Sequence, residues 1–273
     1  MIFQLPKKAN NVIIKKVVDI VQIILSLLFF IFILEFLLRT GIWNNPIIPY
    51  PSEIWKRFVE IGLRDDILIK QVQMSLTRMV IGYIAAILIG LSIGAILGQS
   101  SILEDMFKPL LSFMMSIPTI AWVPFLLVTL GLGDRTVLMA IFLGGFFAIA
   151  YNTMEGMRGV KNSLVNVGRN MGLSHFDMFT KIYLPGSMVS ILTGLRLGIS
   201  YSWRALVGAE MLAALIEEGL GRMISDARVW NDLTLMLLGL TMIGLIGMLM
   251  DKIIIGFLEQ RTVRRWGMIK EEK

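Results

Sequence analysis

Six blocks of mostly apolar residues alternate with shorter polar segments along the chain. An α-helix rises about 1.5 Å per residue, so a helix of about twenty residues crosses a hydrocarbon core of roughly 30 Å. The pattern therefore predicts an all-α, polytopic membrane protein with about six transmembrane helices, organised as a single domain over residues 1–273. The predicted spans are Val17–Leu38, Met79–Gly98, Phe107–Leu130, Thr136–Met154, Ser187–Ala214 and Leu233–Leu258.

Two of these regions carry a further local signal. Between the first two spans, "SEIWKRFVEIGL" places Ile54, Phe58 and Ile61 on one helical face, which predicts an amphipathic helix at the membrane interface. Residues 1–74 are then the first span plus this interfacial helix. Pro118 and Pro124 interrupt the third span, because proline inside a helix removes a backbone hydrogen bond.

Composition narrows the classes of function. The chain is 56% hydrophobic and only 17% charged, with a net charge of +6. Its basic residues are not interleaved with exposed aromatic residues as in a nucleic-acid surface, so we expect no nucleic-acid partner. With no cysteine and one histidine, we expect no disulfide framework, no metal site and no catalytic constellation.

Orientation follows from the basic residues. They gather in the amino-terminal tail, in the loop between spans four and five, and at the carboxyl end. With six spans these regions share one side, which the positive-inside rule assigns to the cytoplasm. The segment between spans one and two is also basic and opposes this assignment, but we interpret it as the interfacial helix. Both termini are therefore predicted to be cytoplasmic.

A stripe of small residues follows one face of the second span. Small side chains at this spacing let two helices approach closely, whereas a lipid-facing helix has no need of them. Packing inside one subunit and contact between subunits both remain open, and a self-complementary stripe slightly favours a homodimer. The stripe consists of Gly82, Ala86, Gly90, Gly94 and Gly98.

The loop between spans four and five reads as two short amphipathic helices. Val160, Leu164, Val167 and Met171 fall on one face of the first helix. Headgroup anchoring and docking of a soluble partner are both compatible with such a loop.

Helix-ending and helix-capping residues within the loop predict where the second helix begins and ends. Gly172 stands where the first helix is expected to end, and Ser174 with Asp177 forms a capping-box pattern that starts the next. Pro185 is expected to end that helix and turn the chain into span five. The apolar side of the second helix is predicted to contain Phe176 and Phe179, with Ile182 or Tyr183.

The same loop resembles a known family. Gly172, nine residues, and then Ile182-x-Leu184-Pro185 resemble the cytoplasmic "EAA" loop of binding-protein-dependent ABC importer permeases of type I. "IPTIAWVPFLLVTLGLGD", "GLRLGISYSWRALVGAEML" and "GLGRMISDAR" resemble the branch that imports nitrate, taurine and alkanesulfonates. The resemblance covers about Ser75 to Trp266.

The resemblance implies an ATPase-coupling loop on this chain. In the family this loop carries a coupling helix that seats in a groove of the ATPase subunit. One departure is Asn166-Val167-Gly168, which stands where the family usually has Glu-Ala-Ala and removes a carboxylate from the expected contact. The residues implied in coupling are Gly172, Ser174, His175, Phe176, Asp177, Phe179, Ile182, Leu184 and Pro185.

The resemblance also implies the partners. It implies a multi-pass permease in the lipid bilayer of the bacterial cytoplasmic (inner) membrane, together with an ABC ATPase dimer, a second permease subunit and an extracytoplasmic substrate-binding protein. ATP and Mg²⁺ would bind to the ATPase, so this chain would bind no cofactor and would not be an enzyme.

Charges inside spans are expensive and mark candidate functional residues. Arg204 and Glu210 stand in span five beside Tyr201 and Trp203. They either pair with other spans or line a translocation path that favours an anion. The segment "GLGRMISDARVW", which follows span five, could close an outer gate, meet the binding protein or lie at the interface.

We therefore expect a permease subunit that forms the path for a small anionic or heteroaromatic solute similar to nitrate, a sulfonate or taurine. The alternative is a secondary active transporter without an ATPase partner. That class typically shows paired half-sequences and intramembrane acids for ion coupling, and no internal repeat is visible here. The sequence leaves the identity of the solute open.

Overall fold

The computed structural model describes residues 28–40, 48–64, 66–213 and 218–251, together with residues 22, 25 and 26. These residues form helices and turns without strands. The chain divides into two compact units, Met1–Asp65 and Asp66–Lys273. The first half of the predicted span Val17–Leu38 and the end of the predicted span Leu233–Leu258 lie outside the described residues.

The first unit contains a helix through residues 28–39 and then α2 (Pro51–Phe58), which η1 (Val59–Arg64) continues as a π-helix. The Glu35 carboxylate joins the two helices, since it accepts a hydrogen bond from the Ser52 backbone N–H at 3.0 Å and another from the Ser52 hydroxyl at 2.9 Å. Arg39 pairs with the same carboxylate at 2.7 Å. The predicted amphipathic segment is therefore helical, and its position at an interface stays a prediction.

The second unit holds eleven elements in the described residues. Four helices are long and apolar enough to cross a membrane: α3, α6, α11, and the continuous helical stretch His175–Leu212 that joins α8, η3 and α9. A fifth candidate is the pair α4 and η2–α5, which is bent by 86°. The elements are α3 (Ile67–Gly98), α4 (Ser101–Ser116), η2 (Thr119–Ala121), α5 (Trp122–Leu130), α6 (Asp134–Arg158), α7 (Asn162–Asn170), α8 (His175–Met178), η3 (Phe179–Tyr183), α9 (Leu184–Leu212), α10 (Leu220–Val229) and α11 (Leu233–Met250).

The predicted glycine stripe on α3 packs against α6 of the same chain. A Cβ atom built on Gly94 would lie 2.5 Å from the Ala150 carbonyl oxygen, and one on Gly98 would lie 2.6 Å from the Met157 Cβ. Gly82 and Gly90 face α6 in the same way. Because α6 occupies this face, the stripe is not free for a subunit interface, and the argument for a homodimer drawn from it is withdrawn.

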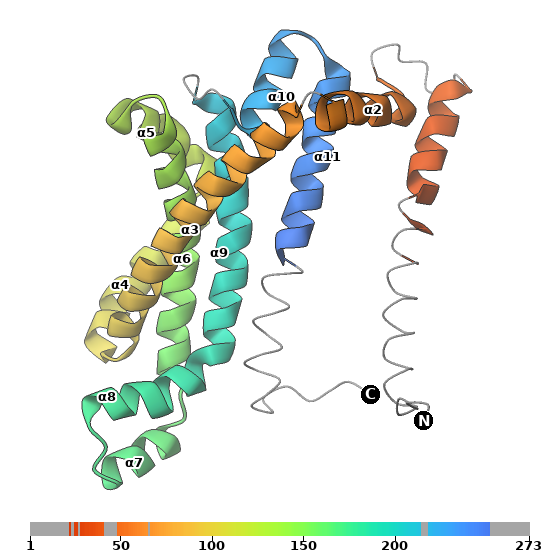
Figure 1. Cartoon of the computed structure of the whole chain (residues 1–273). Coiled ribbons are helices and arrows are strands. Elements are labelled where there is room, and N and C mark those ends of the chain that lie inside the picture. The colour runs from red at the N-terminus through yellow and green to blue at the C-terminus, as the bar shows by residue number, and fades with distance from the viewer. Residues whose placement is uncertain are drawn as a thin grey trace, which may run out of the picture. The chain divides into compact units, whose positions relative to one another are not determined.

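Helix α6 is covered by α9 on another side, so it forms the centre of the bundle (Figure 1). A Cβ atom on Gly144 would lie 3.1 Å from the Ser202 Cα. The Ser202 hydroxyl donates to the Ile141 carbonyl at 2.8 Å, which satisfies a polar group that is fully buried. The core of this unit is therefore three helices, α3, α6 and α9, held close by small residues.

The third predicted span is broken at one of its two expected prolines. The break between α4 and η2 falls at Ile117 and Pro118, where both residues adopt extended backbone conformations. Pro124 was expected to interrupt the span as well, but it lies in the first turn of α5. A missing N–H is tolerated there, because the first N–H groups of a helix have no intrahelical partner.

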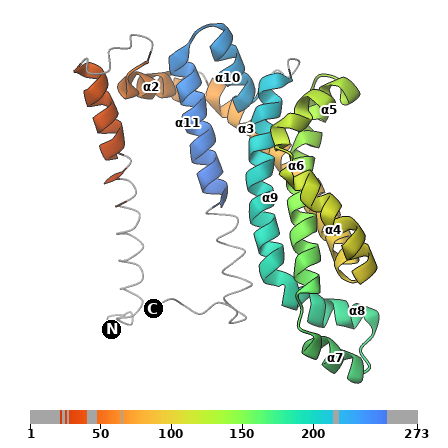
Figure 2. The same ribbon diagram turned by 180° about the vertical axis from the view of Figure 1, so that it is seen from behind.

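The second unit has two ends that differ in structure. Helices α7 and α8 lie at one end of α9, and α10 lies at the other, as both views show (Figure 1 and Figure 2). We call these the loop end and the α10 end. The two ends contain the candidate functional residues described next.

Candidate functional site

The predicted turn and cap of the loop are both present. Gly172 adopts a φ of +71°, a left-handed conformation that glycine accepts readily, and it ends the first short helix. The Ser174 hydroxyl oxygen accepts a hydrogen bond from the Asp177 backbone N–H at 3.1 Å and caps α8. The Asp177 carboxylate in turn accepts from the Ser174 hydroxyl at 2.7 Å and pairs with Lys181.

Helix α7 packs on α8 and η3 through Val165 and Gly168. Val160, Val165 and Met178 form a buried cluster, and Ile182 packs against it. A Cβ atom on Gly168 would lie 2.6 Å from the Met178 sulfur, which marks a close contact with the movable end of that side chain. Leu164, Val167 and Met171, on the predicted apolar face, take no part in this cluster and are exposed.

Four large apolar side chains of the two loop helices are exposed, and we call them together the loop patch. Phe176 is 76% exposed, and its three partners are each more than half exposed. Asn166, the residue that departs from the family pattern, is also exposed. Large apolar side chains gathered at a polar end of a protein mark an interaction surface. The patch consists of Leu164, Val167, Met171 and Phe176.

Phe179 takes a different position from Phe176. It packs inward with Tyr183 and Leu184 against Ala95, Met157 and Ile191, which belong to α3, α6 and α9. The expectation that Phe176 and Phe179 share an outward face is therefore wrong. Phe179 begins η3 and is one turn nearer to the spanning helices, whereas Phe176 lies in the first turn of α8.

Pro185 does not end the second loop helix as expected. The chain stays helical from His175 to Leu212, with Pro185 in the first turn of α9 and the π-helical η3 before it. Figure 1 shows that α8 and α9 nevertheless run in different directions. A wider turn before the proline accommodates both its ring and its missing N–H. His175 is exposed at the start of α8.

Glu210 is the centre of a buried network at the α10 end. It is fully buried. The Ser75 hydroxyl donates to its carboxylate and lies 2.9 and 2.8 Å from the two carboxylate oxygens. The Arg78 guanidinium donates to it at 2.9 Å, and the Gly221 backbone N–H donates at 3.0 Å. Of the two alternatives left open by the sequence, Glu210 therefore pairs with another span. It does not line a path within this chain.

Arg78 extends this network to a fourth helix. Its Nε donates to Asp134 at 2.8 Å, at the start of α6, while the guanidinium itself is nearly buried. We call Ser75, Arg78, Asp134 and Glu210 the α10-end cluster. Sequence reasoning missed Arg78, which stands 132 residues from Glu210 and looks like a loop cation. The only signal was the unexplained acid in span five.

A second group of charges lies at the loop end, between α4 and α6. Arg158 pairs with Glu104 at 2.9 Å, and Lys108 pairs with Glu155 and with Glu104, the latter at 3.7 Å. Three of these side chains are more than one third exposed, and Glu104 is nearly buried. We call Glu104, Lys108, Glu155 and Arg158 the loop-end cluster.

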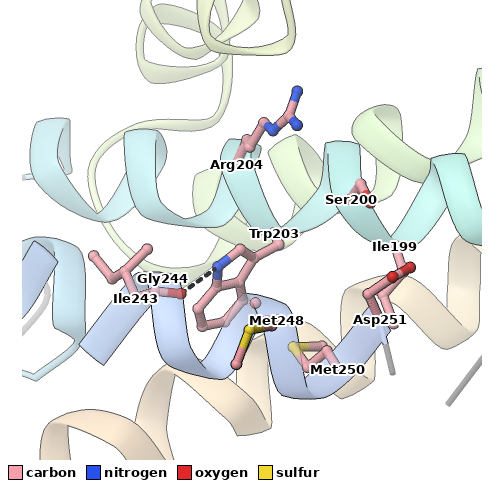
Figure 3. A pocket seen from close by; sticks show the side chains of 10 residues that line it. Ile199, Ser200, Trp203, Arg204, Ile243, Gly244, Met248, Met250 and Asp251 are labelled. Atoms are coloured by element: carbon pink, nitrogen blue, oxygen red, sulfur yellow. Dashed lines mark hydrogen bonds between the residues drawn. The ribbon is translucent and has the colours of Figure 1, made fainter. Parts of the chain in front are cut away.

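A cavity of about 340 Å³ separates α9 from α11. Trp203 and Arg204 line it together with Met248 and Asp251. Figure 3 shows the Trp203 ring turned toward α11, with its Nε1 donating to the Ile243 carbonyl at 3.2 Å. The Arg204 guanidinium points away from this ring (Figure 3).

Only some of the four predicted path residues lie at the cavity. Trp203 and Arg204 line it, whereas Tyr201 does not, and Glu210 lies in the α10-end cluster. In the described ranges, no three His, Asp or Glu side chains come together as metal ligands would. The arrangement provides surfaces for packing, docking and charge pairing.

Comparison with known proteins agrees with this arrangement. The family model described as "Binding-protein-dependent transport system inner membrane component" matches residues 70–264. The nitrate import permease protein NrtB of Synechocystis is 34% identical over 214 residues, which cover 78% of this chain and 76% of that protein. The taurine transport system permease protein TauC of Escherichia coli is 28% identical over 208 residues, or 75% of each chain.

A solved structure shares the fold. The MetNI methionine ABC transporter, in an inward-facing conformation, matches with a TM-score of 0.58 and 20% identity over 73% of this chain and 95% of that chain. The match of the family model over most of the chain identifies the family. This chain belongs to the family of binding-protein-dependent transport system inner membrane components.

Proposed function

We propose that this chain forms the translocation path for a small anionic solute and is driven by an ATPase that docks on its loop patch. The chain is a permease subunit of an ABC importer, a transport component and not an enzyme. The observation that supports the docking proposal most strongly is the loop patch itself, four exposed apolar side chains on a short, capped pair of helices.

The link from the loop to the spans supports coupling. Helix α8 continues through η3 into α9, and Phe179 anchors the bend against three spans. A push on α8 would therefore move α9 directly, without a loose linker. Because Asn166 is neutral, the contact with the ATPase would depend on apolar packing more than on a salt bridge. ATP and Mg²⁺ would bind to the ATPase subunits.

Co-purification tests the docking. We would express the chain with the ATPase and the substrate-binding protein that serve the same solute, and purify through a tag on this chain alone. The ATPase should co-elute from wild type and be lost from Phe176→Asp, because a carboxylate in an apolar contact remains desolvated and unpaired. Trp230→Asp is the matched control, since Trp230 is 81% exposed at the opposite end.

Two results would contradict the docking. Retention of the ATPase by Phe176→Asp would show that the loop patch is not the docking surface. Failure of wild type to retain any ATPase in mild detergent, with uptake intact, would favour the alternative of a secondary active transporter.

The nature of the solute rests on Arg204 and on the names of the relatives. Those names specify nitrate and taurine, both of which carry an anionic group. A cation in a spanning helix is expensive and is retained for function, and Arg204 lines the cavity between α9 and α11. We therefore assign to Arg204 the attraction of an anion along the path.

Uptake measurements test this assignment. Arg204→Gln should lower the maximal uptake rate of nitrate, taurine or an alkanesulfonate, whichever is transported, by about tenfold or more. Arg204→Lys should retain part of the rate. Arg196→Gln, on the same helix, tests whether any cation of α9 suffices and should have a smaller effect, because Arg196 pairs with Asp251 at 3.5 Å. Selective uptake of an uncharged heteroaromatic solute would contradict the assignment.

Sidedness is part of the same proposal. We place the chain in the bacterial inner membrane with both termini and the loop end in the cytoplasm, and with the α10 end facing the binding protein. The chain has no cysteine, so an introduced cysteine is the single thiol of this subunit that a reagent can label. Trp230→Cys should react with an impermeant thiol reagent in intact spheroplasts, whereas Phe176→Cys should react only after permeabilisation. The reverse result would invert the orientation.

The second permease subunit is proposed to be another copy of this chain, because closed twofold symmetry is the commonest oligomeric arrangement. Two differently tagged copies should then co-purify in one complex with the ATPase. Recovery of a single tag together with a different permease would show a heterodimer.

A further inference from the structure

We infer that α10 and the ends of α3, α6 and α9 that meet it form one rigid unit throughout the transport cycle, and that Glu210 is the positioning residue that holds α10 in it. That α10 stays in this unit during transport rests on the proposed function, whereas the role of Glu210 in holding α10 concerns the chain by itself.

The start of α10 is bound by side chains of other helices. Gly219, at its N-cap position, has no side chain with which to cap the first turn. The backbone N–H of Gly219 donates to Gln71 Oε1, that of Leu220 to Ser75 Oγ at 2.8 Å, and that of Gly221 to Glu210 at 3.0 Å. Three successive amides thus have acceptors on α3 and α9. Glu210 also places a negative charge at the positive end of the α10 dipole.

Close packing removes the freedom of α10 to slide. A Cβ atom on Gly219 would lie 2.6 Å from Glu210 Oε1, and one on Gly221 would lie 2.5 Å from the Val207 carbonyl oxygen. On the opposite side, a Cβ atom on Gly239 of α11 would lie 2.6 Å from Ile224. Both sides of α10 therefore meet a neighbour at distances that only glycine permits.

The completeness of the network favours a rigid unit over a gate. The Glu210 carboxylate has three donors, which are the Ser75 hydroxyl, Arg78 and the Gly221 N–H, and Arg78 is shared between Glu210 and Asp134. Fully satisfied buried networks rigidify a structure, and separating their members leaves a charge buried without compensation. A gate that opened here would incur this cost in every cycle. Movement is therefore assigned to the bent α4–α5 pair and to η3.

Thiol protection measures whether Glu210 holds α10. Ala227 is 1% exposed on the buried side of α10, so Ala227→Cys should react slowly with a thiol reagent. Trp230→Cys is the exposed reference, and Ala140→Cys in α6, also 1% exposed, reports loosening of the whole bundle. Adding Glu210→Gln should raise the rate at position 227 by about tenfold, because labelling follows local opening, and leave position 140 unchanged.

A matched control removes a charge from α10 without touching the network. Asp226→Asn breaks an ion pair with Arg222 that lies within α10, so the rate at position 227 should not change. An equal rise in both variants, or no rise with Glu210→Gln, would overturn the positioning role of Glu210. If Glu210→Gln does not assemble, Ser75→Ala removes the hydroxyl shared by Glu210 and Leu220, and it should raise the same rate.

The cycle is tested in the complete complex. With the ATPase trapped by ATP and vanadate, the rate at position 227 should stay within about twofold of its resting value, because a unit that stays closed keeps its protection. A rise toward the rate of Trp230→Cys would show that α10 opens and would overturn the rigid unit. Co-elution of the trapped ATPase with the tagged chain confirms that the complex is assembled, which separates this failure from failure of the proposed function.

Discussion

The two charged clusters of this chain contain similar side chains, but they differ in how far these side chains are exposed to solvent. The α10-end cluster joins α3, α6, α9 and α10 through Arg78 and Glu210, whose side chains are 6% and 0% exposed. The loop-end cluster joins α4 to α6 through Arg158 and Lys108, whose side chains are 55% and 42% exposed. Arg78 and Glu210 are surrounded by protein, with Asp134 at the exposed edge of their cluster, whereas most of the loop-end cluster is in contact with its surroundings.

This difference in exposure sets what each cluster can do. Exposed ion pairs contribute little to stability, and salt screens them, so their partners exchange easily. A buried pair with filled hydrogen bonds is expensive to break, because the remaining charge loses its compensation. The chain thus combines a fixed α10 end with an adjustable loop end. That is the arrangement expected of a transporter driven from its loop end.

The largest effect should come from removing the cation of the buried cluster. Arg78→Met leaves Glu210 buried without its partner and should lower the free energy of unfolding by about 3–5 kcal/mol. Arg158→Met, at the loop end, should lower it by less than about 1 kcal/mol. Denaturant titration of the purified chain in detergent would measure both. Equal losses in the two variants would remove the distinction between the ends.

A smaller effect should come from crowding the start of α10. Gly221→Ala places a methyl group 2.5 Å from the Val207 carbonyl oxygen. It should destabilise the chain by about 1–3 kcal/mol, as overpacking does. Gly244→Ala in α11 is the control, because nothing lies within 4 Å of its added Cβ. The same titration should show no loss for Gly244→Ala, and tolerance of Gly221→Ala would argue against close packing of α10.

The smallest effect should follow from a change at the loop end. Lys108→Gln removes the cation shared by Glu104 and Glu155. The thermal midpoint should change by less than about 2 °C, since these side chains are solvated in either state. Raising the salt concentration should shrink even that difference. A large drop would mean that the loop-end cluster is structural after all.

Much of the helical framework could be predicted from sequence. The predicted span Thr136–Met154 lies within α6, and Ser174 caps α8 as its spacing with Asp177 indicates. Apolar periodicity and caps depend on neighbours along the chain, so one sequence shows them. The second span was predicted to start at Met79, with Lys70 and Arg78 in the segment before it. Ion pairing of Arg78 lets the helix begin at Ile67.

The candidate site was harder to predict because its contacts are distant in sequence. Nothing local indicates that Glu210 meets Ser75 and Arg78, or that Phe179 turns inward while Phe176 turns outward. The inward turn depends on contacts of Phe179 with α3, α6 and α9, which the residues of the loop do not indicate. The same limit applies to the glycine stripe, whose spacing indicates a close partner helix without saying which one.

The π-helical segment η3 has a consequence for the length of the chain. A π-turn holds one more residue than the α-turn it replaces, so deleting Thr180 would restore ordinary winding between α8 and α9. Both turns complete one revolution of the helix, so removing the extra residue leaves α8 at nearly the same rotation about the axis. Phe176 would then stay in the loop patch. Deleting Thr180 should therefore be tolerated better than deleting a residue from the α-helical part of α9, where each lost residue rotates the preceding helix by about 100°.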